Sequence, residues 1–437
     1  MPWREPIAEI YRRLLAREPD APGLEGYAAA LMHGGLDLAE VEARIAGSDE
    51  ARTVERLRLE ITRRFETFAF RPPTESELWS ELATARAQGT GGGYRPLNVE
   101  LDVTTQCNLR CVMCHFSDPV ISAGARRDWS VSEFEMVARQ VFPFAQRLSL
   151  SISTEPLLNP SFCEFLPIVA SYGVPHTYIN TNGLLLTEAI VTRMIETGFH
   201  AVSISLDGAT AATYERVRHG GQWATVIANI QMLQRLRERA RSETPRVTFG
   251  FVLMRSNIAE TPYFVQLAHE LGVRDVHFLH LIPYAGLGLA DESLTHAKEL
   301  CDTTMAAVRR RGQELGVAVT TPAPFCGQEP PAHLRAQQRF SLALRDETKH
   351  AQICPFPWHF VGIDGHGNVL PCGTWAAQAP MDNLTQSSFL EIWNGDRWRD
   401  LRTEWAKSAP RAHCRICPAA AMGSTQSEAA FGERAGR

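Results

Sequence analysis

The chain has 437 residues, a length that allows two or three domains with well-buried cores. Hydrophobic residues make up 44% and charged residues 21%, as in ordinary soluble proteins, and the formal net charge of −5 gives no electrostatic case for binding nucleic acid or an anionic membrane surface. The N-terminus lacks the apolar segment of a secretory signal, and no apolar run has spanning length. We therefore expect a cytoplasmic protein without a transmembrane helix.

Residues 1–70 are predicted to form an all-helical domain, because apolar residues recur there at helical spacing. This region resembles a small helical domain of unknown function, on the residues Tyr11–Asp20 together with Gly23, Leu24 and Tyr27. That domain is often attached to bacterial surface proteins and glycosyltransferases. Residues 71–96 follow, with two prolines and a glycine-rich run, and are predicted to be a linker with little secondary structure of its own.

Residues 97–325 change to an alternation of strands and helices, which predicts parallel strands joined by crossover helices. The expected strands are Leu97–Thr104, Arg147–Ser153, His176–Asn180, Ala201–Leu206, Arg246–Leu253 and Asp275–Leu281. Six such units are too few for a closed eight-fold barrel, so the fold class is α/β, with an open partial (β/α)6 barrel. Along the fourth strand Ser203, Ser205 and Asp207 alternate with apolar residues, which predicts a polar inner face that lines a ligand site.

Seven of the ten cysteines fall into two spaced groups, and in a reducing compartment such groups favour metal binding over disulfides. The first group, Cys107-Asn-Leu-Arg-Cys111-Val-Met-Cys114, directly follows the first predicted strand. Three thiolates supply three of the four ligands of a [4Fe–4S] cluster and leave one iron open. A zinc site with His115 as fourth ligand is the alternative for these residues alone.

Three later strand ends decide between these alternatives. They read Ser153-Thr-Glu-Pro156, Asn180-Thr-Asn-Gly183 and Ser203-Ile-Ser-Leu-Asp-Gly208, and Tyr214–Arg218 comes after them. In order and spacing these segments and the cysteine motif resemble the radical S-adenosylmethionine (SAM) enzymes, although Ser-Thr stands where that family has Gly-Gly. The resemblance implies that SAM binds the open iron and is cleaved to a 5′-deoxyadenosyl radical. It also implies that five residues contact SAM: Thr154, Glu155, Thr181, Ser205 and Arg218.

The second group of cysteines lies near the C-terminus and consists of Cys354, Cys372, Cys414 and Cys417. Four thiolates can hold a complete [4Fe–4S] cluster or a structural zinc ion. The surrounding sequence over residues 350–421 resembles the SPASM/twitch domains of radical SAM enzymes, and the cysteine count favours the twitch type with one auxiliary cluster for electron transfer. The tail of residues 422–437 is predicted to be disordered.

A few remaining residues are candidates for substrate chemistry. We hypothesise that Cys326, in a loop before the second cysteine group, donates a hydrogen atom to a substrate radical, although a buried or inert thiol is the more common role. His277, His280 and Tyr284, near the end of the sixth strand, are candidate substrate contacts. Cys163 and Cys301 lie in helical patterns and are expected to be small buried side chains.

The expected function is therefore that of a radical SAM oxidoreductase reduced by a partner such as flavodoxin or ferredoxin. The leading expectation is dehydrogenation of a sugar, aminocyclitol or glycan precursor, which depends on the proteins that carry the N-terminal domain. The alternatives are epimerisation of a carbohydrate, maturation of a ribosomally made peptide (RiPP), and a non-enzymatic iron–sulfur or zinc scaffold. The sequence does not identify the substrate.

Overall fold

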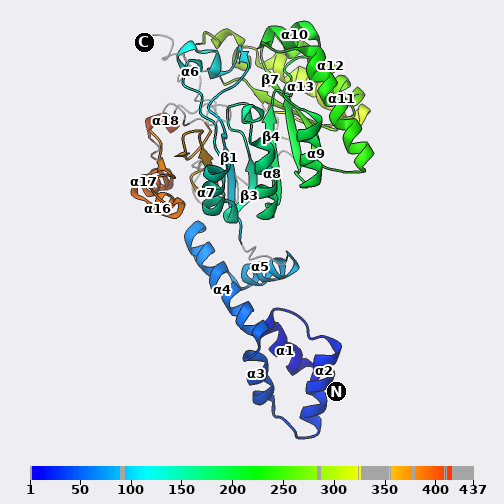
Figure 1. Cartoon of the computed structure of the whole chain (residues 1–437), viewed down its shortest axis with the longest axis vertical. Helices are drawn as coiled ribbons and strands as arrows, with labels where there is room; N and C mark the ends of the chain where they lie inside the picture. The colour runs from blue at the N-terminus through cyan, green and yellow to red at the C-terminus, as the bar shows by residue number, and fades with distance from the viewer. Residues whose placement is uncertain are drawn as a thin grey trace. The chain divides into compact units, whose positions relative to one another are not determined.

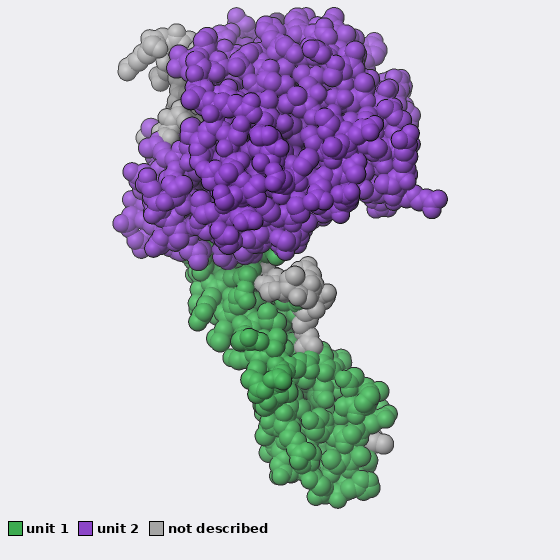
Figure 2. Space-filling model, in the orientation of Figure 1, with its two compact units in different colours: residues 1–96 green, residues 97–437 purple. Residues whose placement is uncertain are grey.

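The computed structural model describes residues 2–88, 94–282, 287–322, 324–325, 354, 356–373, 375, 379–407, 409 and 411–415. The chain divides into two compact units, residues 1–96 and residues 97–437 (Figure 2). Within the described residues, no helix combines the length and the apolar character needed to cross a membrane.

The first unit is helical. Its helices are α1 (Arg4–Leu15), α2 (Ala21–Met32), α3 (Leu38–Ala46), α4 (Asp49–Phe68) and α5 (Glu75–Gln88). The side chains of Asp20, Asp37 and Ser48 accept hydrogen bonds from backbone N–H groups in the first turns of α2, α3 and α4. These caps satisfy donors that have no partner within the helix, and they explain where the helices begin.

Helix α5 corrects the prediction of a linker without secondary structure over residues 71–96. Thr74 Oγ1 accepts a hydrogen bond from the Glu77 backbone N–H (3.3 Å), and the Glu77 carboxylate accepts one from the Thr74 N–H (2.8 Å). This reciprocal pair starts the helix, and buried Leu82 packs in one apolar cluster with residues of α4. Prolines and glycines occur only on either side of Glu75–Gln88, so they mark the ends of a helix here.

The second unit contains a ten-stranded sheet with the order β12-β11-β10-β1-β3-β4-β5-β7-β8-β9. All neighbours from β10 to β9 pair in parallel, and no pairing between described strands joins the two ends of the sheet, so the barrel is open. The parallel strands are β1 (Leu97–Leu101), β3 (Ala145–Ser149), β4 (His176–Thr181), β5 (Ala201–Ser205), β7 (Arg246–Leu253), β8 (Asp275–His280), β9 (Ala318–Thr320) and β10 (Phe360–Ile363). All six predicted strands are present, and the predicted α/β fold class is confirmed.

Helices cover the outer face of this sheet (Figure 1). They are α7 (Val131–Val141), α8 (Phe162–Ser171), α9 (Glu188–Glu196), α11 (Trp223–Ala240), α12 (Thr261–Glu270) and α13 (Lys298–Leu315). The strand side chains that alternate toward the core are almost fully buried, among them Val99, Ile179, Val202, Phe249 and Val276. The opposite side chains of β5 and β7 are partly accessible, so the sheet has the polar inner face that the alternation predicts.

The C-terminal region joins the barrel through β10, which pairs with β1 over four residues. The turn after β10 lies against the residues that follow β1, and the indole of Trp129 donates a hydrogen bond to the Gly365 carbonyl (2.9 Å). A Cβ atom at Gly365 would lie 2.7 Å from the Thr104 carbonyl oxygen, so only glycine allows this close approach. Strands β11 (Asn368–Leu370) and β12 (Asp382–Asn383) then extend the sheet in antiparallel fashion.

Candidate functional site: a three-thiol loop at the strand ends

Residues 107–114 form a loop just beyond the carboxyl end of β1, on the side where parallel barrels place their active sites. Within this loop, β2 (Arg110–Cys111) pairs with β6 (Arg218–His219), and Cys111 lies opposite Arg218. All three thiols, from Cys107, Cys111 and Cys114, belong to one apolar cluster. The structure therefore brings together the three cysteines that the sequence predicts as cluster ligands.

The surroundings of the thiols disfavour free thiolates. Burial raises the pKa of Cys107 to about 12 and that of Cys111 to about 11, and burial also raises the pKa of Cys114. A thiolate at these positions therefore needs a cation as partner, and a bound metal deprotonates its thiol ligands. In the described part of the chain, no group of three or more His, Cys, Asp or Glu side chains is arranged to hold a single metal ion.

Two buried polar atoms beside this loop are left without partners. Arg218 Nε and Tyr214 Oη make no hydrogen bond with any residue that the structure describes. Arg218 Nη1 lies 3.7 Å from Cys111 Sγ. Burial raises the pKa of Tyr214 to about 12, Arg218 opposes the rise, and Cys111 adds to it. Three thiols with two unsatisfied donors beside them fit an iron–sulfur cluster and an anionic ligand, because both offer acceptors to such donors.

Glu155 connects two of the predicted SAM-binding segments, residues 153–156 after β3 and residues 180–183 at the end of β4. Its buried carboxylate accepts hydrogen bonds from Thr181 Oγ1 (2.7 Å), from the Asn182 N–H (2.8 Å) and from the Leu157 N–H (3.2 Å). Burial raises the pKa of Glu155, although these donors oppose the change. The Asn182 side chain also donates to Asn108 Oδ1 (2.7 Å) in the cysteine loop. Glu155 therefore fixes the position of two strand ends relative to each other, and through Asn182 relative to the cysteine loop, residues 107–114.

Asp102, which follows β1, binds residues 152–154, the segment just before Glu155. Its carboxylate accepts hydrogen bonds from the Ile152 N–H (2.8 Å), from the N–H and hydroxyl of Ser153 (3.1 and 3.0 Å) and from the N–H and hydroxyl of Thr154 (3.2 and 2.6 Å). Ser153 and Thr154 stand where radical SAM enzymes have two glycines. Their hydroxyls point to Asp102, so the substitution strengthens the attachment of this segment to β1.

Arg218 and Asp207 form a buried ion pair below the cluster loop. Arg218 Nη2 lies 2.6 Å from Asp207 Oδ2, and the other Asp207 oxygen accepts a hydrogen bond from the Val252 N–H (2.6 Å). Asp207 has φ +59°, a left-handed backbone conformation that an aspartate tolerates better than most residues. Burial raises the pKa of Asp207, and Arg218 opposes this change. This ion pair occupies part of the Arg218 guanidinium. The contact between Arg218 and SAM stays a prediction.

The other predicted residues lie at several places. Thr181 and Ser205 are the last residues of β4 and β5, and Thr154 lies in the segment that follows the carboxyl end of β3, on the same side as the cysteine loop. His277 is on the inner face of β8, where burial lowers its pKa, and His280 contacts the ring of Phe325 with centroids 4.7 Å apart. Cys326 and Tyr284 lie outside the described residues. Cys301 is buried as expected, whereas Cys163 is only half-buried.

Three of the four C-terminal cysteines lie in the described part of the chain. Cys414 is buried, Cys354 and Cys372 are half-buried, and Cys417 lies outside the described residues. Beyond Cys354, the buried Arg402 donates hydrogen bonds to the carbonyls of Pro357 (2.9 Å) and Trp393 (2.8 Å). These bonds tie helices α16 (Phe389–Asn394) and α17 (Asp396–Ala406) to the segment that follows Cys354.

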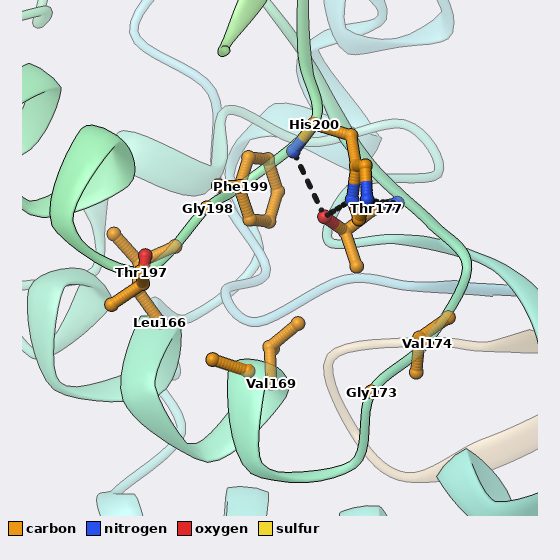
Figure 3. A pocket seen from close by; sticks show the side chains of 10 residues that line it. Leu166, Val169, Gly173, Val174, Thr177, Thr197, Gly198, Phe199 and His200 are labelled. Atoms are coloured by element: carbon orange, nitrogen blue, oxygen red, sulfur yellow. Dashed lines mark hydrogen bonds between the residues drawn. The ribbon is translucent and has the colours of Figure 1, made fainter. Parts of the chain in front are cut away.

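A small cavity of about 90 Å³ lies elsewhere in the barrel (Figure 3). Thr177 and His200 line it, with 2.8 Å between Thr177 Oγ1 and His200 Nδ1. Thr177 is near the amino end of β4, and His200 directly precedes β5, so the cavity lies at the opposite strand ends from the cysteine loop. Ligand pockets generally have about 300 Å³ or more, so this cavity is too small to be the substrate site.

Sequence reasoning missed Asp102 as a functional residue. The sequence feature that could have identified it is a carboxylate near the end of a predicted strand, five positions before Cys107. Asn108 was also missed, because its role depends on a contact with Asn182 from a distant strand end.

Comparison with known proteins agrees with this geometry. A family model described as the radical SAM superfamily matches residues 101–268, and one described as an iron–sulfur cluster-binding domain, SPASM, matches residues 354–418. An AdoMet-dependent heme synthase of Methanosarcina barkeri is 24% identical over 74% of this chain and 88% of its own length. A PqqA peptide cyclase of Xanthomonas euvesicatoria pv. vesicatoria is also 24% identical, over 74% of this chain and 80% of its own length.

Among solved structures, Streptococcus suis SuiB bound to S-adenosylmethionine shares the fold with a TM-score of 0.55 and 14% identity, over 81% of this chain and 79% of SuiB. The expected cofactors, a SAM-binding [4Fe–4S] cluster, an auxiliary [4Fe–4S] cluster and SAM, are those that these two domains imply. Residues 101–268 of this chain are therefore a radical SAM domain, followed by a C-terminal SPASM-type iron–sulfur cluster-binding domain.

Proposed function

We propose that this chain is a radical SAM enzyme that modifies a peptide. The observation that supports a peptide substrate is the similarity to a PqqA peptide cyclase across 74% of the chain, which is more than the radical SAM domain alone. Dehydrogenation of a sugar, aminocyclitol or glycan precursor, the leading expectation from the sequence, has no comparable support. The peptide alternative therefore replaces it.

The chain's own residues would bind and position the cofactors. Cys107, Cys111 and Cys114 would hold the first cluster, which when bound and reduced supplies an electron that cleaves SAM to methionine and a hydrogen-abstracting 5′-deoxyadenosyl radical. Glu155 and Asp102 hold the strand ends around it through the hydrogen bonds described above. The barrel and the buried loop would keep water away from the radical.

SAM would contact the strand ends at Thr154, Glu155, Thr181 and Ser205, with Arg218 beside the cluster. The Thr154 hydroxyl already donates to Asp102, so this residue would offer SAM its backbone carbonyl. The Arg218 Nε donor, which has no partner among the described residues, is the part of that side chain available to a carboxylate.

The C-terminal cysteines Cys354, Cys372, Cys414 and Cys417 would hold the auxiliary cluster. Four protein ligands leave no open iron, which suits transfer of an electron from the oxidised substrate better than binding of the substrate. We also propose that a flavodoxin or ferredoxin reduces the first cluster, and that the protein acts in the cytoplasm.

Anaerobic reconstitution followed by product analysis tests this function. About eight irons per chain are expected for two cubane clusters. Reduction in the presence of SAM should give 5′-deoxyadenosine, and a small peptide encoded beside the gene should lose two hydrogen atoms by mass spectrometry. Stoichiometric zinc without 5′-deoxyadenosine would contradict the radical SAM assignment. Oxidation of sugars with no change in any neighbouring peptide would contradict the peptide proposal alone.

A further inference from the structure

The inner face of the barrel contains a polar pair that the cofactor site does not use. Glu100 on β1 is two residues before Asp102 and shares its face of the strand, so it lies about 7 Å deeper in the barrel. In the register of the sheet, Glu100 lies beside Ser149 on β3, and Ser149 lies beside Tyr178 on β4. These strands are neighbours in Figure 1. The three residues therefore form one row across three strands.

A hydrogen bond joins the two ends of this row. Tyr178 Oη donates to Glu100 Oε1 at 3.0 Å, across the small side chain of Ser149. No other described residue donates to the Glu100 carboxylate, so Oε2 is available to a ligand. Glu100 and Tyr178 are both partly accessible, whereas Val99 and Ile179 beside them on the outer face are fully buried. The free oxygen therefore faces the inside of the barrel.

Among the described residues, one further carboxylate and one guanidinium act on the charge of Glu100. The carboxylate is that of Asp102, two residues further along the chain, and the guanidinium is that of Arg147 on β3. The Arg147 guanidinium carbon lies 5.4 Å from the centroid of the Tyr178 ring, and it forms no ion pair with Glu100 within the described residues. Burial lowers the pKa of His277 on β8, so this side chain adds no positive charge near neutral pH.

We propose that Glu100 and Tyr178 form a subsite on the inner face of the barrel that binds a protonated amine or guanidinium side chain of the substrate, an inference that rests on the proposed peptide substrate. The free carboxylate oxygen accepts a charge-assisted hydrogen bond, and the nearby Asp102 carboxylate also favours a cation over an acidic side chain. Tyr178 orients the carboxylate. Thr181 at the carboxyl end of β4 is three residues from Tyr178, about 10 Å along the strand, so a side chain bound here belongs to a substrate that extends toward the SAM site.

Binding of small model peptides to the reconstituted full-length protein tests the subsite without turnover. The probes are Nα-acetyl-lysine methylamide and its uncharged analogue Nα-acetyl-norleucine methylamide, titrated by NMR in the presence of SAM. The titration is done at about pH 8, above the pKa of about 7 of Glu100, so that the carboxylate is ionised. The wild type should bind the lysine probe about tenfold more tightly, as expected for one charge-assisted hydrogen bond. Glu100→Gln should abolish this preference, and Tyr178→Phe should reduce it. Glu164→Gln, a change at an exposed glutamate on α8, should retain it.

Three results would overturn the subsite. These are equal binding of the two probes to the wild type, an unchanged lysine preference in Glu100→Gln, and tighter binding of Nα-acetyl-glutamate methylamide than of the lysine probe. If thermal unfolding shows that Glu100→Gln does not fold, the Tyr178→Phe variant tests the subsite in its place. A reduced preference for the lysine probe then supports the subsite, and an unchanged preference contradicts it. Failure of the proposed function is distinguishable, because it would appear as absent 5′-deoxyadenosine or unmodified peptide while the probe preference is measured independently.

Discussion

The strand ends of the barrel and its inner face both carry enclosed carboxylates, but the two regions satisfy them differently. At the strand ends, Asp102 accepts five hydrogen bonds and Glu155 accepts three, nearly all from neighbouring strand ends. On the inner face, Glu100 accepts one hydrogen bond, from Tyr178. Buried acceptors with a full set of donors rigidify a structure, whereas an acceptor with spare capacity can bind a ligand.

This difference separates two kinds of function within one barrel. Carboxylates at the strand ends hold backbone segments in place, so that the cluster loop and the SAM motifs keep a fixed geometry. The carboxylate on the inner face leaves an oxygen free for the substrate. Substitutions at the strand ends should therefore reduce stability and cofactor binding, whereas a substitution on the inner face should change recognition more than stability.

The largest expected effect is at the cluster ligands. Cys111→Ala removes one of three thiolates, so the first cluster should be lost, iron content should fall by about four atoms per chain, and 5′-deoxyadenosine formation should fall at least about a thousandfold. Iron analysis and chromatography measure these changes. Cys163→Ala, at a half-buried cysteine outside both groups, is the control and should keep both properties. Full iron content in Cys111→Ala would contradict the ligand assignment.

The contrast between the two regions also shows how far the sequence could predict this molecule. Alternating apolar residues predicted β7 with both bounds correct, because a long strand buried on one face has a strong period. The cysteine spacing predicted the loop, because its ligands are close in sequence. The role of Asp102 and the Glu100–Tyr178 pair depend on the register between strands separated by 50 or more residues, which a single sequence does not encode locally.

Strand β10 illustrates the same limit. Phe360–Ile363 is a short run of four buried residues, which a single sequence cannot distinguish from a buried helical turn. Its pairing with β1 brings together segments about 260 residues apart, a count that follows from the register Asn98↔Phe360. The close approach of Gly365 to Thr104 becomes apparent only once the two segments are adjacent.

The next largest effect should come from breaking the Arg218–Asp207 ion pair. Arg218→Met leaves the buried Asp207 carboxylate without its cation, which should cost about 3–5 kcal/mol of stability. Thermal unfolding measures the loss. Arg216→Met, two positions away at an exposed arginine, should cost much less. If the double variant Arg218→Met with Asp207→Asn is no more stable than Arg218→Met alone, the ion pair is not the cause.

A smaller effect is expected at Asp102. Asp102→Asn keeps the size of the side chain but turns an NH₂ group toward backbone donors, which should cost about 2 kcal/mol and weaken SAM binding. Equilibrium binding of SAM and thermal unfolding measure the two consequences. The control is Asp291→Asn, at an exposed aspartate. Unchanged SAM affinity in a folded Asp102→Asn variant would show that this carboxylate only stabilises the fold.

The smallest effect should be a pH dependence of stability that is caused by Glu100 on the inner face. Burial is the main cause that raises the pKa of Glu100 from 4.5 to about 7, with Asp102 adding to the rise and Tyr178 and Arg147 opposing it. The folded chain therefore holds this proton more tightly than the unfolded chain, so the stability that the bound proton confers is present at low pH and is lost as pH rises from 4.5 to about 7.

Glu100→Gln cannot ionise, so its Tm relative to the wild type should increase between pH 5 and pH 7 and become constant above about pH 8. Glu164→Gln should show a constant difference, because Glu164 is exposed on the outer helix α8. A difference that does not change with pH for Glu100→Gln would mean that the carboxyl ionises in the folded protein as it does in water. The inner face would then be as well solvated as the surface, and a bound cation would gain little from Glu100, because water would compete for its free oxygen.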